Sequence, residues 1–367
     1  MNKKAAVITA YNPYNFKGGI ETYTIQLLAL LKDFNIDIDL YCIDMIEKGL
    51  NLHNEFVGRM YLLGRKVNAS AHRYDFIIAN SFYGFGCFPP KGKVFNIFHS
   101  THIGFSEGIK GVIPPVTYFE LRYLYGELLE SVSGFDRIKI AVSENIRDEL
   151  KNNYGFEDVK VINNCIDTSA FSKTDKYKAR RKLGIPSEAY VGLNVGRWDI
   201  TKGSDILEGV MRSAGASNVF WVVVPGTGTD RTMVPPLDNI MVFDHIEHEK
   251  MSEVYNAADF VLFTSRYESF GYVIIEALAC GVPVITTNVG VAKTIYRHEP
   301  FRKLLLPDLK QENSIIVESC IEKLNLLRDD ETLRELISSE GRSLIEKNFN
   351  LSRWRHEMSR VIGISKI

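Results

Sequence analysis

Short runs of apolar, β-branched residues recur along the chain, with room for a helix between most of them. Runs of this length and composition are typical of strands. Helical patterns separate several of them, for example at residues 21–32 and 143–152. Because strands that alternate with helices form parallel sheets with helical crossovers, the pattern predicts an α/β fold. The first half supplies six predicted strands, at residues 5–9, 38–42, 76–79, 94–98, 139–142 and 159–162.

A second series of strands follows a polar segment, residues 172–181, which we interpret as a linker. We therefore predict two domains, residues 1–172 and 173–350, followed by a helical stretch within residues 351–367. A length of 367 residues suits two domains of ordinary size. The predicted strands of the second domain are residues 191–195, 219–224, 240–243, 260–264 and 284–287.

Composition narrows the class of protein. The hydrophobic content of 45% and charged content of 24% are ordinary for a soluble globular protein. A net charge of −1 argues against a dedicated nucleic-acid binder, whose surface would be basic. The five cysteines are odd in number and lack C-x-x-C spacing, which favours a reducing cytosol over a disulfide framework. We expect neither a signal peptide nor a membrane-spanning segment, because no apolar run is long enough.

Residues 264–285 carry the most informative pattern in the chain. Glu268 and Glu276 are separated by seven residues, in a segment that predicts strand, loop, helix and strand. Gly271 lies near the predicted helix start, where free backbone N–H groups and the helix dipole favour an anion. A phosphate site with a carboxylate on each side suits a nucleotide-sugar, with one acid for the sugar hydroxyls and one for the ribose.

Other candidate residues follow predicted strands, at the sheet edge where open α/β folds bind ligands. Gly18 and Gly19 follow the first strand, where absent side chains would let a ligand approach the backbone, although a simple turn is the alternative. His99 follows residues 94–98. Arg197 and Lys202 could form a solvated helix start, but they also suit the charge of a departing diphosphate.

Four segments together resemble family 4 of the retaining glycosyltransferases. Residues 264–285 resemble the family's E-x7-E signature, and residues 194–205 resemble its Arg-(x)4-Lys-Gly phosphate element. Residues 16–22 are similar to the N-terminal Gly-Gly loop, and residues 161–171 are similar to the Asn-Gly-(Ile/Val)-Asp element that ends the first domain. The four occur in the family's order across almost the full chain.

The resemblance implies the GT-B fold, in which two Rossmann-like domains have parallel sheets that face each other across an interdomain cleft. The first domain would bind the acceptor and the second the donor, and the last helix would pack back on the first domain. The implied activity is transfer of a sugar, with retention, from a nucleotide-diphosphate sugar to a sugar, glycan or lipid-linked acceptor. Uridine diphosphate is favoured only by its frequency in the family.

The resemblance also assigns site residues. The base would lie near His245 and Ile246, the ribose on Glu276, and the transferred sugar on Glu268. His99, Glu268, Arg197 and Lys202 would be catalytic, and no cofactor or metal is expected because Arg197 and Lys202 neutralise the diphosphate. The complete donor set is Gly18, Gly19, Arg197, Lys202, His245, Ile246, Glu268, Phe270, Gly271, Tyr272, Val273 and Glu276. The acceptor set is Asn80, His99 and His102.

Two positions depart from the family pattern. Ser269 replaces the glycine commonly found after the first glutamate. Because a hydroxyl there could contact the donor sugar or narrow its pocket, the resemblance does not identify the donor sugar. Cys165 replaces a glycine in the Asn-Gly element, and nothing in the sequence explains that cysteine. His248 is interpreted as a surface histidine. The partial glycine pattern at residues 226–228 lacks the third glycine of a dinucleotide fingerprint, so an NAD-dependent dehydrogenase is not favoured.

Alternatives remain open. Another GT-B nucleotide-sugar enzyme (an epimerase, hydrolase or phosphorylase) shares these features, and a non-catalytic subunit would share the fold. Residues 111–130 could lie near a lipid-linked acceptor at the inner membrane face, but an ordinary buried helix is favoured because exposed apolar patches are uncommon. We expect a cytoplasmic protein with at most peripheral membrane contact.

Overall fold

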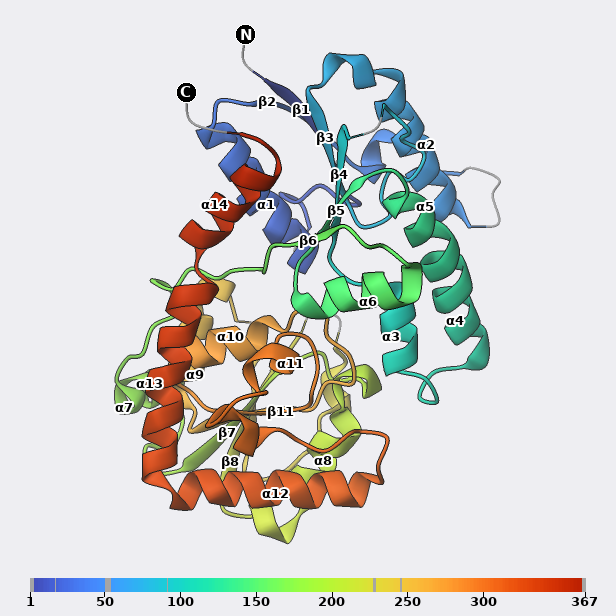
Figure 1. Ribbon diagram of the computed structural model, residues 1–367. Coiled ribbons are helices and arrows are strands. Elements are labelled where there is room, and N and C mark those ends of the chain that lie inside the picture. Colours follow the sequence, from blue (N-terminus) through green and yellow to red (C-terminus); the bar gives the residue numbers. More distant parts are fainter. Residues whose placement is uncertain are drawn as a thin grey trace. The chain divides into compact units, whose positions relative to one another are not determined.

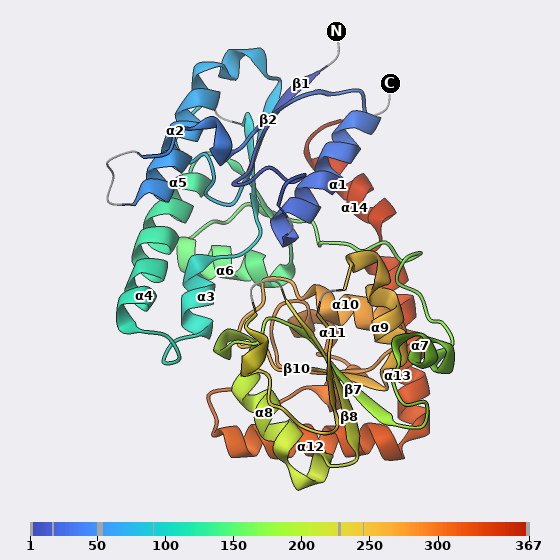
Figure 2. The ribbon, with the colours of Figure 1, turned by 180° about the vertical axis from the view of Figure 1, so that it is seen from behind.

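The computed structural model divides into two compact units, each built around a parallel sheet (Figures 1 and 2). It describes residues 3–16, 18–49, 54–90, 92–226, 229–244 and 246–364. The N-terminal unit comprises Met1–Asn164 with Trp354–Ile367, and the C-terminal unit comprises Cys165–Arg353. The chain passes between units after residues 164 and 353, whereas the predicted domain limits are residues 172 and 350.

The sheet of the N-terminal unit has six parallel strands in the order β2-β1-β3-β4-β5-β6. Its central strands are apolar because both faces are covered, and β3 and β4 are buried throughout. All six predicted strands are confirmed to within one residue at each end. Their bounds are β1 Lys4–Ile8, β2 Asp37–Tyr41, β3 Phe76–Asn80, β4 Val94–Phe98, β5 Ile138–Ala141 and β6 Val159–Val161.

Helices cover this sheet, and several begin at clear caps. Ser143 caps α6 by accepting a hydrogen bond from the N–H of Ile146, and Gly155 ends that helix at φ 68°. Trp354 of α14 packs edge-on against Tyr23 of α1, with ring centroids 5.4 Å apart, and the two helices lie side by side in both views. The helices are α1 Gly19–Asp33, α2 Glu55–Ala69, α3 His102–Gly108, α4 Pro115–Phe119, α5 Ser131–Gly134, α6 Glu144–Tyr154 and α14 Leu351–Val361.

The interpretation of residues 111–130 as an ordinary buried helix is wrong in two respects. Helix α4 begins only at Pro115, which is well suited to a first helical position, and it continues through a π-helical stretch, Glu120–Glu130, into α5. Several of its apolar side chains are exposed to solvent. Val116 is 79% exposed, and Phe119, Tyr123 and Leu128 are each about half exposed.

The C-terminal unit contains a five-stranded parallel sheet in the order β11-β10-β7-β8-β9. Its strands also match the prediction to within one residue. Both sheets are parallel and carry helices, so the predicted α/β class is confirmed. The strands are β7 Tyr190–Gly196, β8 Val219–Pro225, β9 Ile240–Val242, β10 Phe260–Phe263 and β11 Val284–Thr286.

The predicted linker is partly helical. Asp175 accepts a hydrogen bond from the N–H of Lys178 and starts α7, and Arg180 of this helix is buried in an ion pair with Asp259, 2.6 Å away. Helix α8 packs against α12, whereas α7, α9, α10 and α13 form a second group. The helices of this unit are α7 Lys176–Leu183, α8 Ser204–Arg212, α9 Met251–Ala257, α10 Tyr272–Ala279, α11 Ala292–Ile295, α12 Asn313–Asp329 and α13 Glu331–Asn348.

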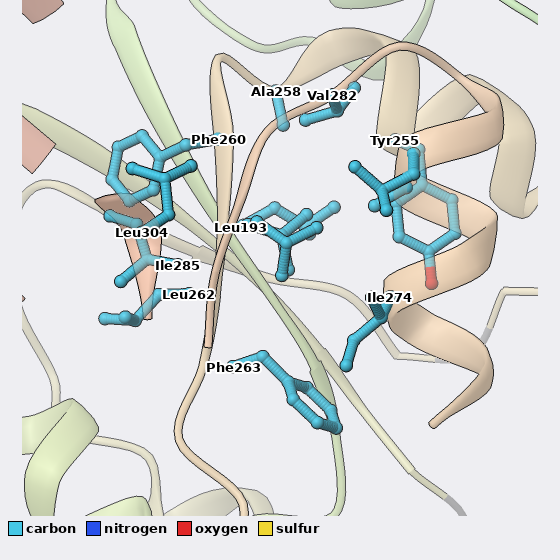
Figure 3. Close-up of a cluster of buried hydrophobic side chains, with 14 of the residues drawn as sticks. Leu193, Tyr255, Ala258, Phe260, Leu262, Phe263, Ile274, Val282, Ile285 and Leu304 are labelled. Atoms are coloured by element: carbon cyan, nitrogen blue, oxygen red, sulfur yellow. The ribbon is translucent and has the colours of Figure 1, made fainter. Parts of the chain in front are cut away.

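The core of the C-terminal unit fixes helix α10 against its sheet (Figure 3). Leu262 and Ile285 pair in register on β10 and β11, and Ile274 of α10 packs into the same cluster with no exposed surface. Tyr255 of α9 is also completely buried. The positions of Gly271 and Glu276, at the start and in the body of α10, are therefore set by apolar packing.

Across the part of the chain that the structure describes, no helix combines the length and apolar character needed to cross a bilayer.

Candidate active site

The loop after β7 carries Arg197 and Lys202. Asp199 organises it: its carboxylate accepts hydrogen bonds from the N–H groups of Thr201 and Lys202, and it lies 3.2 Å from Arg197. Gly203 ends the short 3₁₀ turn, Ile200–Lys202, at φ 75°. A Cβ there would lie 2.2 Å from the carbonyl oxygen of Thr264, so only glycine fits between the loops that follow β7 and β10.

The same close approach brings Lys202 to Glu268. The Nζ atom of Lys202 lies 2.5 Å from Oε1 of Glu268, and the hydroxyl of Ser265 donates to the same oxygen at 3.0 Å. Their side chains are 27% and 15% exposed, so the pair is reachable from solvent. The structure thus joins two residues predicted from motifs more than sixty residues apart, and it adds Ser265, which no sequence motif identified.

Helix α10 begins next to this ion pair. Gly271 adopts φ 93° at its N-cap, as predicted for a glycine at the helix start. Phe270 is 2% exposed and packs edge-on against Tyr272 and Phe349, so its ring belongs to the core and only its backbone can meet a ligand. Burial also raises the pKa of Tyr272. Val273 is half-buried in the first turn of the helix.

Glu276 is held by two side chains. Its Oε2 atom accepts a hydrogen bond from the hydroxyl of Tyr255 at 2.7 Å, and its Oε1 atom lies 3.2 Å from Nε2 of His248. The hydrogen bond that His248 makes to Glu276 raises the pKa of His248, and burial raises the pKa of Tyr255. His248 is a surface residue as predicted, with a side chain 66% exposed, but it is also a partner of Glu276.

The loop after β9 is only partly described. His245 lies outside the described residues, as do residues 227 and 228 of the partial glycine pattern. Ile246 is half-buried and packs against the core of the C-terminal unit. His248 follows two residues later, and its ring is edge-on to Phe171 with centroids 5.3 Å apart.

In the N-terminal unit, Gly18 and Gly19 differ in their surroundings. A Cβ on Gly18 would lie 2.5 Å from a carboxylate oxygen of Glu21, whereas a Cβ on Gly19 would meet nothing within 4 Å. Glu21 itself is only 6% exposed in the first turn of α1. A side chain at position 18 would therefore displace the end of the Glu21 side chain, and one at position 19 would displace nothing.

His99 and Asn80 form a buried pair at the ends of β4 and β3. The Nε2 atom of His99 lies 2.8 Å from Oδ1 of Asn80, whose Nδ2 donates to the carbonyl of Ile8 at 3.1 Å. Since this amide orientation makes Oδ1 an acceptor, Nε2 of His99 carries the proton. Burial lowers the pKa of His99 to about 3, which keeps the ring neutral.

The direct acceptor contact predicted for Asn80 is not available in this structure. Asn80 has no exposed surface, and both atoms of its amide are already hydrogen-bonded. Its role is therefore to hold His99, which retains 8% exposure.

His102 lies at the start of α3, away from the His99–Asn80 pair. Its Nδ1 atom is 2.7 Å from Oε1 of Glu130, a residue with no exposed surface. The sequence marked His102 but not Glu130, because the two are 28 residues apart and nothing in the pattern around Glu130 distinguishes it from a solvated helix residue.

The chain contains one Asp-x-Asp pattern, at Asp37 and Asp39, but it lies on β2, where both carboxylates pair with Lys4 at 3.2 and 3.1 Å. Among the described residues, no three or more His, Cys, Asp or Glu side chains are grouped so that they could hold a metal ion.

Comparison with known families covers most of the chain in two parts. Residues 17–170 match the model described as Glycosyltransferase Family 4, and residues 175–343 match Glycosyl transferases group 1. The chain belongs to the family 4 glycosyltransferases. The two matched ranges contain every site residue predicted from the sequence, and these residues belong to both units of this family 4 protein.

Curated relatives match this glycosyltransferase over less than half of its length. A D-inositol 3-phosphate glycosyltransferase from Acidothermus cellulolyticus is 30% identical over 199 residues, which cover 45% of this chain and 44% of the relative. A protein of the same name from Segniliparus rotundus is 34% identical over 145 residues, covering 36% of this chain and 32% of the relative. The matched regions therefore span under half of these relatives.

Solved structures match almost the whole chain and confirm the GT-B fold. Sucrose-phosphate synthase from Thermosynechococcus elongatus is similar with a TM-score of 0.76 and 19% identity, covering 98% of both chains. WaaG, a glycosyltransferase involved in lipopolysaccharide biosynthesis, gives 0.74 at 16% identity over 98% of this chain and 99% of its own. Anabaena HepE in complex with UDP and glucose gives 0.68 at 18% identity over 99% of this chain and 100% of its own.

Proposed function

We propose that the protein transfers a sugar, with retention of configuration, from a UDP-sugar to a hydroxyl of a sugar, glycan or lipid-linked acceptor. The observation that carries the proposal is the Lys202–Glu268 pair beside Arg197 and the start of α10. This arrangement offers cations and helix N–H groups for a diphosphate and a carboxylate for sugar hydroxyls. UDP and glucose bound to the similar Anabaena protein, and the activity named for the inositol-phosphate relatives, support it.

The donor would be held mainly by the C-terminal unit. Arg197 and Lys202 would bind the diphosphate together with the backbone of residues 271–273. Glu268 would leave Lys202 for the sugar hydroxyls, and Glu276 would turn from His248 to the ribose. The base would lie near His245 and Ile246, on the loop after β9.

Charge stabilisation explains why we expect no metal requirement. Departure of UDP leaves about two negative charges on the diphosphate. A guanidinium and an ammonium, fixed by Asp199 and Glu268 before the donor arrives, can neutralise them without a divalent ion. Retention follows from the family resemblance, with the leaving diphosphate assisting attack of the acceptor on the same face of the sugar.

The acceptor would be held by the N-terminal unit. Neutral His99, oriented by Asn80, would lie near the reacting sugar, and His102 would contact the acceptor. The exposed apolar side chains of α4 and its π-helical extension suit peripheral contact with a lipid surface, which supports a lipid-linked acceptor.

Nucleotide binding tests the proposal before any acceptor is known. We expect millimolar UDP with EDTA to raise the unfolding midpoint of the protein, because a ligand that binds only the folded state stabilises it by mass action. GDP, ADP and NAD serve as comparison ligands. Lys202→Met should lose the shift, whereas Lys182→Met, which removes an exposed lysine paired with Glu253, should keep it.

Product analysis completes this test. Incubation with UDP-sugars and a panel of glycans should release UDP and form a glycoside with the donor's anomeric configuration. An epimerised donor, or a sugar phosphate as the product, would replace the proposal with another GT-B activity. A folded sample that neither binds a nucleoside diphosphate nor turns over any donor would contradict it.

A further inference from the structure

Glu130 is a completely buried carboxylate that accepts three hydrogen bonds. Its Oε1 atom lies 2.7 Å from Nδ1 of His102, and its Oε2 atom accepts from the backbone N–H of His102 at 2.9 Å. The hydroxyl of Tyr154, at the end of α6, also donates to Oε2. A buried carboxylate needs hydrogen-bond donors in place of water, and here they come from His102 of α3 and from Tyr154 of α6.

This arrangement fixes which nitrogen of His102 carries the proton. An ionised carboxylate has no proton to donate, so Nδ1 of His102 must be the N–H group. In the neutral ring, Nε2 is then a lone-pair acceptor. Among the described residues no hydrogen-bond partner reaches Nε2, and the side chain keeps 21% of its surface exposed.

The ring of His102 is also fixed in orientation. Tyr125 stacks on it at a centroid distance of 5.2 Å and an interplanar angle of 21°, and Phe82 lies edge-on at 5.6 Å. Tyr125 is held in turn by Asn54, whose Nδ2 donates to the tyrosine hydroxyl at 3.0 Å. His102 can therefore neither flip nor rotate its open nitrogen without breaking contacts to several elements.

We propose that Glu130 is a positioning residue that makes Nε2 of His102 the hydrogen-bond acceptor for a hydroxyl group of the sugar acceptor. The inference rests on the proposed function and deepens it by specifying the chemistry at this point of the acceptor site. A neutral nitrogen lone pair takes a hydroxyl and repels a phosphate or carboxylate. The part of the acceptor that reaches His102 is thus an uncharged, hydroxyl-bearing ring.

The asymmetry of the Glu130 contacts provides a sharp test. Two donors, the backbone N–H of His102 and the hydroxyl of Tyr154, point at Oε2 of Glu130. In Glu130→Gln the carbonyl oxygen will occupy that position, which places the amide NH₂ against Nδ1 of His102. The imidazole proton must then move to Nε2, so the variant keeps the size of the side chain but presents a donor to the acceptor hydroxyl.

The matched control is Glu149→Gln. Glu149 accepts hydrogen bonds from Thr101, the N-cap of the same helix α3, and from Asn145, but it has no contact with His102. Among the described residues, the hydrogen bonds of His102 run to Glu130, so Glu149→Gln perturbs the start of α3 and leaves the partner of the His102 ring in place. A second variant, His102→Phe, keeps a ring to stack on Tyr125 and removes both nitrogens, so it tests the inference should Glu130→Gln fail to fold.

The first readout is the long-range proton–nitrogen NMR spectrum of the eight histidines in mildly alkaline buffer, with His102 assigned from His102→Phe. We expect Nδ1–H in the wild type and in Glu149→Gln, and Nε2–H in Glu130→Gln. Methyl glycosides and myo-inositol should shift the wild-type Nε2 resonance, and inorganic phosphate should not. An Nε2–H tautomer in the wild type would overturn the proposal.

The second readout is kinetic. For a methyl glycoside or inositol that accepts the sugar, Glu130→Gln and His102→Phe should raise the acceptor KM about tenfold to a hundredfold, the effect of a lost or opposed hydrogen bond. The control Glu149→Gln should keep both the wild-type acceptor KM and the wild-type rate of slow UDP-sugar hydrolysis without acceptor. An unchanged acceptor KM with a reversed tautomer would refute the role of His102, whereas a folded wild type that neither binds a nucleoside diphosphate nor turns over any donor would refute the proposed function.

Discussion

The Nζ atom of Lys202 lies 2.5 Å from Oε1 of Glu268, so the residue predicted to hold a diphosphate is bound to the residue predicted to hold the sugar. Each neutralises the other at a partly exposed position. A donor that supplies both a diphosphate and sugar hydroxyls can replace this ion pair with two separate interactions, one for each partner.

Replacement of Glu268 by Gln should therefore affect turnover more than folding. We expect kcat to fall about a hundredfold or more, as for other groups that interact with the transition state, because Gln no longer stabilises developing charge near the sugar. Stability should change by less than about 1 kcal/mol, since partly exposed ion pairs contribute little. Glu253→Gln, which breaks the exposed pair with Lys182, is the control; equal kcat for Glu268→Gln and wild type would refute the assigned role.

Arg197→Ala should lower turnover and weaken UDP binding together. Its guanidinium is 54% exposed, and Asp199, 3.2 Å away, holds it where a ligand can reach it from solvent. Loss of one charge-assisted contact corresponds to roughly tenfold to a hundredfold in UDP affinity. Isothermal titration with UDP measures this loss, and Arg212→Ala, which removes an exposed side chain at the end of α8, should bind normally. Normal UDP binding by Arg197→Ala would remove Arg197 from the phosphate site.

UDP affinity should fall as the pH is lowered, because protonated His248 competes with the ribose for Glu276. The Glu276 hydrogen bond, and the nearby charges of Glu276 and Glu249, raise the pKa of His248. Its contribution to stability is therefore present below the unfolded pKa of a histidine, about 6.5, and is lost as pH rises through the higher folded pKa. For a side chain this exposed the contribution is well below about 1 kcal/mol.

Titration of UDP between about pH 5.5 and 8 tests this competition. His248→Asn should bind UDP more tightly than wild type at the acidic end and equally at the alkaline end. His356→Asn, at an exposed position of α14, should keep the wild-type profile. A pH-independent affinity in the wild type would show that the ribose does not displace His248.

Gly203→Ala should destabilise the protein by about 2 kcal/mol or more, because it combines a strained backbone with a clash. Gly184→Ala is a matched control at nearly the same φ, 72° against 75°, with nothing within 4 Å of its added Cβ. The free energy of unfolding of the control should fall by only about 1 kcal/mol, the effect of the left-handed conformation alone. Urea unfolding measures both; equal losses would mean that the Thr264 carbonyl moves aside.

The sequence predicted both sheets and the donor loops because their signals are local. Apolar runs mark buried parallel strands, and the spacing of Glu268, Gly271 and Glu276 survives in one strand–loop–helix unit. Partners from distant segments carried no such signal: Tyr255 reaches Glu276 across 21 residues, and Glu130 reaches His102 across 28. Which side chain completes a buried polar pair depends on how helices pack on the sheet, and the pattern around either residue does not contain that information.

The α4 segment and the predicted linker show that local composition can also mislead. Apolar residues at positions 111–130 suggested burial, but the structure exposes Val116 and Phe119. Polar residues at positions 172–181 suggested a linker, yet Asp175 caps a helix there and Arg180 finds Asp259, 79 residues away. In both cases the composition of the segment alone did not predict which side chains would be exposed or which residues would be helical.

The contact between Gly203 and Thr264 has a consequence for altering donor preference. Gly203 lies against the carbonyl oxygen of Thr264, and the Thr264 hydroxyl donates to the carbonyl oxygens of Lys202 and Gly203. Because of these close contacts, the loops after β7 and β10 behave as one exchangeable block. Grafting the loop that contains Ser269 and Glu268 from another member of the family would misplace Lys202 unless residues 197–204 were grafted with it. Recombination of natural sequences at this site should accordingly yield active chimaeras when both loops come from one parent, and inactive ones when they are split.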